Sequence, residues 1–105
     1  MPHFLLTGKD GSDAEALNRR MANRPAHLHG AERMKESGHL LMGAAMLDPE
    51  GKMVGSVMIF NFESRQKLDE YLKTEPYVTG NVWQHIEIQD IAVASHFLPV
   101  QTVKA

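Results

Sequence analysis

The sequence contains no cysteine, and only 7% of its residues are aromatic. The absence of cysteine excludes disulfide bonds, a thiol nucleophile and a zinc site built on thiolates. Since small secreted proteins more often carry disulfides, it also favours a cytoplasmic location. No run approaches the ~18 apolar residues of a membrane helix, and residues 1–10 lack the basic and apolar regions of a secretory signal. We therefore expect a soluble cytoplasmic protein with no membrane partner.

Strong charge of either sign is also missing, because 11 Lys+Arg against 13 Asp+Glu give a formal net charge of −2. No basic patch stands out, so nucleic acid is not an expected partner. The glycines form neither a dinucleotide-binding fingerprint nor a phosphate loop, and Ser56 lacks the glycines of a nucleophile elbow. The 105 residues predict one domain over 1–105, with a core at about 2–94 and a C-terminal tail at 95–105.

Changes in hydrophobic periodicity predict four strands and two helices. The turn chemistry of residues 48–52 joins two apolar runs into a hairpin. Gly38 is placed to end the first helix, and Ser64 is placed to cap the second. The strands are expected at 2–7, 39–47, 53–62 and 82–94, and the helices at 12–37 and 65–73.

Three features of the first predicted helix give finer expectations. Ser12 and Glu15 have the spacing of a capping box, which predicts that the helix starts there. Pro25 lacks a backbone N–H, so it should kink the helix or restart it near Asn23. The run of residues 17–24, which contains three arginines, is expected to form a solvated face.

The predicted order βαββαβ is typical of an α+β fold, the ferredoxin-like antiparallel sheet with both helices on one face. The two hairpin strands do not alternate between apolar and polar residues, as half-exposed strands would. Both faces of the hairpin are therefore expected to be buried, although two helices cover only one. This predicts a homodimer packed sheet to sheet. A monomer is the alternative, but it would expose more apolar surface than soluble monomers usually do.

The six histidines are candidate functional residues. His27 and His29 lie two residues apart on a helix, so their side chains point to nearly opposite sides and do not share a metal ion. No metal site is expected, although a looser site with one histidine and one carboxylate stays open. Near Pro25, His27 could point into the gap between helix and sheet. Spacing alone favours a surface histidine or a hydrogen-bonded core histidine.

Glu75 immediately precedes Pro76, so the second helix must end there. Helix C-termini disfavour negative charge, and this conflict suggests that Glu75 accepts a hydrogen bond from a histidine. A solvated loop glutamate is the alternative. Arg24 and Arg33 could hold an anionic group or form surface ion pairs. Tyr77 could line a cleft or act as a packing plug.

Three segments together resemble the YciI-like (YCII-related) family. They are RPAHL at 24–28, LLMGAAMLDPEGKMVGSVMIF at 40–60 and TEPYVTGNVW at 74–83, followed by the closing strand. Each segment alone is a weak signal, but their order and spacing are fairly specific. The resemblance covers about residues 2–94. It implies a dimeric α/β-barrel of ferredoxin-like subunits with a cleft in which His27 meets Glu75. The family usually has aspartate where this chain has Glu75.

The resemblance implies general acid–base chemistry of the lyase or isomerase type, such as dehydrochlorination or proton transfer on a small cyclic organic molecule. His27 would move the proton, Glu75 would hold its tautomer, and Arg24 and Tyr77 would contact the substrate, with no organic cofactor. Because the extra methylene of Glu75 displaces the carboxylate, this departure from the family counts against the implied catalysis more than against the implied fold. One alternative is a non-catalytic module that binds small molecules. A cofactor-free oxygenase is another, but it would need a more aromatic pocket than this chain offers.

Overall fold

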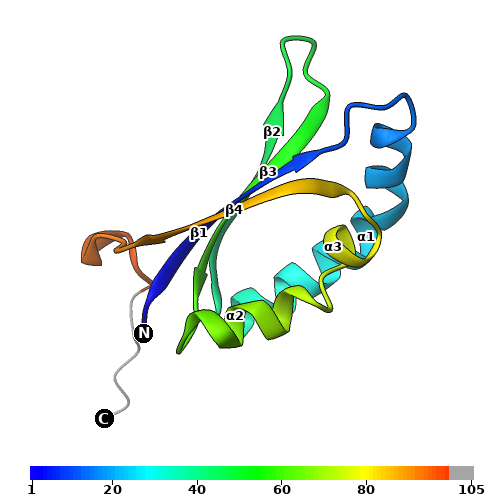
Figure 1. Cartoon of the computed structure of the whole chain (residues 1–105). Helices are drawn as coiled ribbons and strands as arrows, with labels where there is room; N and C mark the ends of the chain where they lie inside the picture. Colours follow the sequence, from blue (N-terminus) through cyan, green and yellow to red (C-terminus); the bar gives the residue numbers. More distant parts are fainter. Residues whose placement is uncertain (100–105) are drawn as a thin grey trace.

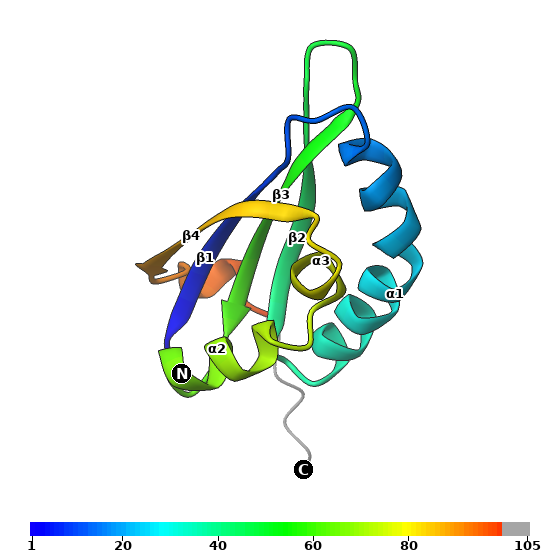
Figure 2. The same cartoon turned by 45° about the vertical axis from the view of Figure 1, so that its right-hand side comes forward.

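The computed structural model describes residues 1–99 and contains the predicted βαββαβ order with one extra helix. The four strands form one antiparallel sheet in the order β2-β3-β1-β4, and the helices lie on one side of it (Figures 1 and 2). This confirms the α+β, ferredoxin-like prediction. The elements are β1 (His3–Asp10), α1 (Ala16–Glu36), β2 (Leu40–Leu47), β3 (Met53–Asn61), α2 (Arg65–Leu72), α3 (Pro76–Thr79), β4 (Trp83–Ile91) and a 3₁₀ turn (Ser95–Phe97).

The core lies between the sheet and the helices. Strands β1 and β3 alternate, so that Phe4, Leu6, Met58 and Phe60 point inward and are at most 3% exposed. The helices and the loops around them complete this core with Phe62, Leu68, Leu72, Tyr77 and Val82. No helix within the described part of the chain is long and apolar enough to cross a membrane.

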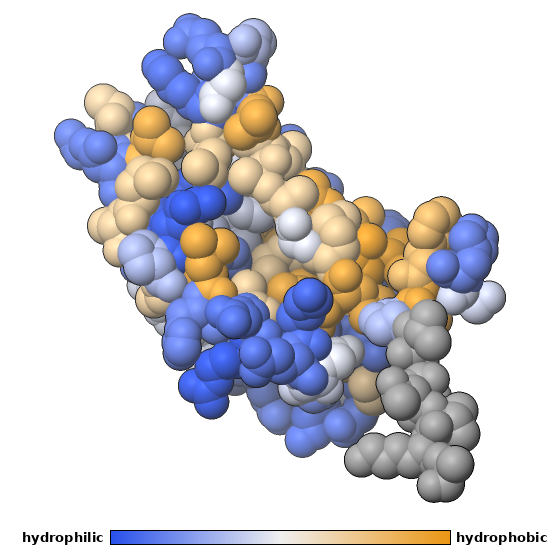
Figure 3. Space-filling view, turned by 180° about the vertical axis from the view of Figure 1, so that it is seen from behind, coloured by the Kyte–Doolittle hydropathy of each residue, from blue (hydrophilic) through white to orange (hydrophobic). Residues whose placement is uncertain are grey.

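The opposite side of the sheet is left open in the single chain. Met42 is 40% exposed, and Ala44 beside it on β2 is also exposed. Viewed from behind, apolar side chains form a broad band between the polar tip of the β2–β3 hairpin and the polar helical surface (Figure 3). A register shift between Leu40 and Met42 explains part of the missing alternation, because the residues on either side of it change face.

The predicted start of α1 at a Ser12–Glu15 capping box is wrong. Helix α1 begins at Ala16, and no side-chain cap is present at its N-terminus. Asp13 instead accepts a hydrogen bond from the backbone N–H of Ala16 through its carbonyl and pairs through its carboxylate with Arg19 at 2.8 Å. The carboxylate of Glu15 accepts from the Asn18 amide rather than reaching back to Ser12.

Pro25 does not restart the first helix, because α1 is continuous from Ala16 to Glu36. A proline removes one backbone donor and crowds the carbonyl four residues earlier, here that of Met21. The Met21 side chain is 45% exposed, so this turn faces water, which can bond the freed carbonyl. The predicted end holds: Gly38 has φ +85° and the hydrogen bonds of a Schellman motif follow Glu36.

The segment after α2, which the sequence predicts to be a plain connection, contains a short helix. Ser64 caps α2 as predicted, accepting from the N–H of Lys67. The chain then forms the short helix α3, with Glu75 as its N-cap and Pro76 at its first position. Proline suits the first helical position, and the Glu75 carboxylate accepts from the backbone N–H of Tyr77 as an N-cap side chain does. The predicted C-terminal tail at 95–105 begins with the 3₁₀ turn, and its residues 100–105 lie outside the described residues.

Candidate functional site

His27 and Glu75 meet in the interior between α1 and α3. His27 Nδ1 lies 2.5 Å from Glu75 Oε1, and the two residues are 8% and 1% exposed. Since an ionised carboxylate only accepts hydrogen bonds, Nδ1 is the protonated ring nitrogen. The second ring nitrogen, Nε2, forms no hydrogen bond within residues 1–99. The pair therefore leaves an imidazole with a free lone pair.

Glu75 is held on every side by donors. Its Oε1 also accepts from the backbone N–H of Tyr77, and its Oε2 accepts from the Tyr71 hydroxyl at 2.7 Å. Burial and the neighbouring Glu75 carboxylate raise the pKa of Tyr71 far above its ordinary value of 10.0. Tyr71 therefore stays protonated and keeps donating. Three donors on one buried carboxylate fix its position and orient His27.

A second buried polar cluster lies beside this pair. Arg20 on α1 donates from Nη1 to the Asp10 carboxylate at 3.0 Å and from Nη2 to Ser56 Oγ at 2.9 Å. The Trp83 indole N–H also donates to Ser56 Oγ. The side chains of Arg20 and Asp10 are each 3% exposed, and burial raises the pKa of Asp10 while Arg20 opposes that rise. The expectation of a solvated face over 17–24 is therefore wrong at Arg20.

Aromatic rings connect the two clusters. The Tyr77 ring stacks on His27 with centroids 3.8 Å apart, and the Arg20 guanidinium carbon lies 4.6 Å from the Tyr77 centroid. Trp83 contacts both rings edge-on. Trp83 fits here because Gly8 on β1 has no side chain, and a Cβ at Gly8 would lie 2.6 Å from the indole. The stacking keeps the His27 ring in one orientation.

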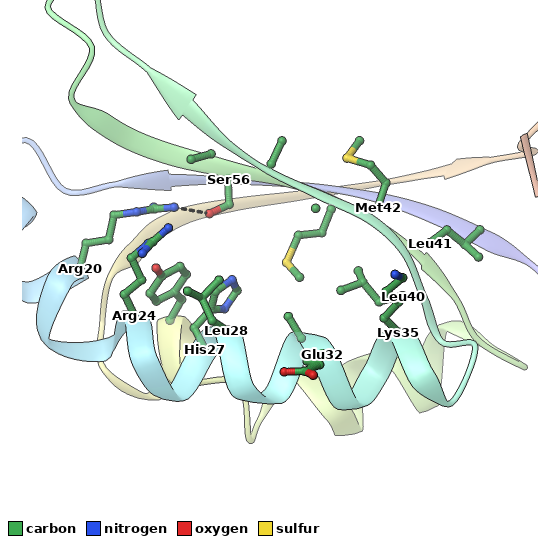
Figure 4. A pocket seen from close by; sticks show the side chains of 16 residues that line it. Arg20, Arg24, His27, Leu28, Glu32, Lys35, Leu40, Leu41, Met42 and Ser56 are labelled. Carbon is green, nitrogen blue, oxygen red and sulfur yellow. Dashed lines mark hydrogen bonds between the residues drawn. The ribbon is translucent and has the colours of Figure 1, made fainter. Parts of the chain in front are cut away.

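A cavity of about 430 Å³ opens between α1 and β2, and the two polar clusters form part of its wall. Arg20, Ser56 and His27 gather at one end of it, and the Arg24 side chain extends into the same space (Figure 4). Arg24 forms no ion pair or hydrogen bond within residues 1–99. The cavity thus combines a free imidazole nitrogen with an uncompensated cation, which suits an acidic ligand.

The structure brings together four of the residues that the sequence singled out, whereas Arg33 is exposed and does not line the cavity. His27 and Glu75 are hydrogen-bonded, Arg24 and Tyr77 line the same cavity as His27, and Tyr77 also belongs to the core. No pattern in the sequence assigned a role in this site to the remaining members, Arg20, Asp10, Ser56, Trp83 and Tyr71. One signal was available: Arg20, Arg24 and His27 follow each other at helical spacings of four and three residues, which puts them on one face.

Comparisons with known sequences agree on one family. A sequence model of the YCII-related domain matches residues 2–92. Protein YciI of Escherichia coli O6:H1 and that of Shigella flexneri are each 30% identical over 92 residues, which cover 82% of this chain and 92% of the relative. A protein of Emericella nidulans, "derivative of benzaldehyde biosynthesis cluster protein C", is 33% identical over 73 residues, 63% of this chain and 74% of that protein.

Solved structures resemble the fold. The 5-chloro-2-hydroxyhydroquinone dehydrochlorinase of Burkholderia phenoliruptrix AC1100, in complex with 2,5-dihydroxybenzoquinone, superposes with a TM-score of 0.75 at 22% identity, covering 90% of this chain and 97% of that one. A dimeric ferredoxin-like protein of unknown function from Jannaschia sp. CCS1 has a TM-score of 0.54 at 16% identity, covering 89% and 100%. At these identities the likeness establishes the fold alone.

Proposed function

Since the chain belongs to the YCII-related domain family, we propose that it is an acid–base enzyme of the lyase or isomerase type. Its substrate is a small cyclic organic molecule with an acidic hydroxyl or C–H group. The observation that carries the proposal is the buried His27–Glu75 pair, whose second imidazole nitrogen is free beside a cavity. An imidazole oriented by a carboxylate is a common general base at neutral pH.

In the proposed reaction, His27 Nε2 takes a proton from the substrate. The electron pair left behind either expels a leaving group as an anion, which completes an elimination, or moves within the ring and is reprotonated elsewhere, which completes an isomerisation. Glu75 keeps the proton on Nδ1 beforehand and faces the imidazolium positive charge afterwards. It acts through His27, and Tyr71 and the N–H of Tyr77 hold it in place.

Arg24, Arg20 and Ser56 are proposed to hold the negative charge that develops on the substrate. Arg20 is balanced by Asp10, but Arg24 is not balanced by any carboxylate among residues 1–99. The electrostatic attraction between Arg24 and a ligand oxyanion is stronger in the cavity than between the same two groups in water, because the cavity wall has low polarity. Tyr77 is proposed to contact the ring of the substrate from the cavity wall.

The dehydrochlorinase with a bound dihydroxybenzoquinone supplies the substrate class for a first test. An acidic, hydroxylated six-membered ring can carry a negative charge, which would balance the positive charge of Arg24 in the cavity. We propose no organic cofactor and no metal, because acid–base elimination or isomerisation is complete with the residues named. A homodimer is proposed from the open apolar side of the sheet. The cytoplasmic location stays a prediction from the missing cysteine.

The test is turnover of 5-chloro-2-hydroxyhydroquinone and of a panel of hydroxyquinols and lactones by the wild-type protein and by His27→Asn. Loss of a general base lowers turnover by roughly 10²–10⁴-fold, and we expect a loss in that range. His29→Asn is the matched control, because His29 is an exposed histidine on the same helix. It should leave turnover unchanged.

Full activity in His27→Asn would remove His27 from the mechanism. A wild-type protein that binds 2,5-dihydroxybenzoquinone but converts no member of the panel would favour the alternative, a non-catalytic small-molecule binding module.

A further inference from the structure

The proposed function leaves open what the remainder of the cavity is for. We infer that the substrate carries an aliphatic substituent on its acidic ring, and that this substituent occupies the end of the cavity that lies away from Arg20 and Ser56. This inference rests on the proposed function, because the acidic ring is placed at His27. It adds a second recognition element, at residues to which that function gives no role.

The cavity has two chemically different ends. The register of the hairpin sets Ala45 opposite Ser56, Gly43 opposite Met58 and Leu40 opposite Phe60. Polar groups therefore gather at the Ala45 end, where Arg20 and Ser56 are bonded to each other. In Figure 4, Arg20 and Arg24 lie at one end, and Leu40 lies at the other end together with the exposed Lys35.

Apolar side chains line the middle and the far end. Leu28 and Ala31 face the cavity from α1, and Leu40, Leu41 and Met58 face it from the sheet. Glu32 and Lys35, both exposed, stand among these lining residues. The far end is thus a short apolar channel that runs along the α1 helix. The buried side chains in it, those of Leu40 and Met58, are both apolar.

The cavity is larger than an acidic ring requires. A cavity of about 150 Å³ accommodates benzene, whereas this one measures about 430 Å³. A ring placed against His27 and Arg24 therefore leaves more than half of the volume empty. Apolar walls next to bulk water favour an apolar occupant, and one that is attached to the ring loses no additional translational freedom on binding. A chain of several carbons on the ring fills this space.

Gly43 supplies a way to close the apolar end alone. A Cβ built at Gly43 would have only the Met58 Cε atom within 4.0 Å, so the position borders open space. The backbone at Gly43 does not require glycine, because its φ is not positive. A β-branched residue suits a strand. The variant Gly43→Val should therefore fold and place two methyl groups beside Met58, two residues along β2 from Ala45, which pairs with Ser56.

The test compares two probes by isothermal titration calorimetry, namely 2,5-dihydroxybenzoquinone and its 3-propyl derivative. Burial of the propyl group should lower the Kd of the wild-type protein by at least about tenfold. In Gly43→Val this advantage should disappear, while the Kd of the unsubstituted ring changes by less than about twofold. Gly30→Ala adds a methyl group at another glycine with free space around it, and it should behave like the wild type.

The outcomes separate this inference from the proposed function. If neither probe binds, the acidic ring has no site at His27, and both proposals fail. If both probes bind equally and Gly43→Val changes neither Kd, the ring site stands and the apolar channel is not a substituent site. If Gly43→Val instead alters the mass of the assembly in solution, a second copy of the chain covers this end, and the inference is overturned.

Discussion

At the scale of single residues, the feature that most separates this site from a generic histidine–carboxylate pair is Tyr71. A glutamate is one methylene longer than an aspartate, and its carboxylate has more positions available to it. Here the Tyr71 hydroxyl donates to Oε2, and His27 Nδ1 and the backbone N–H of Tyr77 both donate to Oε1. The tyrosine lies four residues before Glu75 and reaches it directly. We therefore propose that it is a positioning residue.

The variant Tyr71→Phe tests this role. It removes one hydrogen bond but keeps a ring beside Phe60 and Phe62, whose centroids lie 5.6 and 5.8 Å away. Because Glu75 Oε2 is then a buried acceptor without a donor, its hold on His27 weakens. We expect kcat for 5-chloro-2-hydroxyhydroquinone to fall by about tenfold with KM unchanged.

A purely structural role for Tyr71 would lower the melting temperature and leave kcat per folded protein as it is. The variant Tyr71→Leu serves as a comparison, since it removes both the hydroxyl and the ring. If Tyr71→Phe retains full kcat, Tyr71 does not position Glu75.

At the scale of elements, the short helix α3 delivers the carboxylate. Its N-cap is Glu75 and its first residue is Pro76, so the cap oxygen that bonds the N–H of Tyr77 is the same one that bonds His27. Glu75 thus lies at a helix N-terminus, where negative charge is favoured, rather than only at the end of α2. This removes the conflict that first drew attention to it. The same short helix places Tyr77 against the His27 ring.

The N-terminus of α1 carries a pH-dependent contribution to stability. The hydrogen bond from Arg19 lowers the pKa of Asp13 to about 2 from its ordinary 3.8. A carboxyl group whose pKa is lower in the folded chain stabilises the folded state at every pH above its pKa in the unfolded chain. Above pH 3.8 the free energy of unfolding of the wild type should exceed that of Asp13→Asn by its full amount. This difference should shrink as the pH falls through 2.

Urea denaturation at several pH values, from about 6 downward, measures this difference, and Asp69→Asn on α2 is a control with its own exposed arginine partner. A difference that grows on acidification has the wrong sign for this account. Since Asp13 is exposed, added salt should also reduce the difference.

The sequence predicted the elements whose signals are local. Apolar runs bounded by turn residues indicated the strands, and Gly38 and Ser64 marked helix ends as observed. It mispredicted the start of α1, because the capping-box spacing of Ser12 competes with an ion pair that forms only in the folded chain. It missed α3 because Pro76 and Gly80 also suit a plain turn.

The candidate site divides in the same way. His27 and Glu75 were found through the family resemblance and the unusual place of a carboxylate before proline. Because arginine is seldom buried, the sequence predicts a solvated Arg20. Its burial depends on Asp10 from β1 and Ser56 from β3, and no local pattern joins residues so distant in the chain.

At the scale of the whole molecule, the side of the sheet away from the helices is apolar over β2 and β3. Val57 on β3 pairs with Ala44 on β2 and with Thr7 on β1, on the face opposite to Met58. The helices leave this face uncovered (Figure 2). Sheet-to-sheet packing of two copies would bury it with two-fold symmetry. The account therefore predicts a homodimer.

Sedimentation equilibrium measures the mass directly, and we expect twice the mass of the chain. The variant Val57→Lys should give a folded monomer, because it places a charge in the middle of the predicted interface and leaves the inner core intact. Gln66→Lys, an exposed position on α2, is the matched control and should stay dimeric. A wild-type monomer, or a dimer that tolerates Val57→Lys, would exclude this interface.

The central claim is that a buried carboxylate fixes the proton of His27 on Nδ1 and leaves Nε2 free to act as a base. The measurement that tests it most directly is the ¹⁵N NMR spectrum of the His27 imidazole at neutral pH, in the wild-type protein and in Glu75→Gln. We predict a protonated Nδ1 and an unprotonated Nε2 in the wild type, and loss of this single tautomer in the variant. A wild-type ring protonated on Nε2, or a spectrum that Glu75→Gln leaves unchanged, would contradict the account.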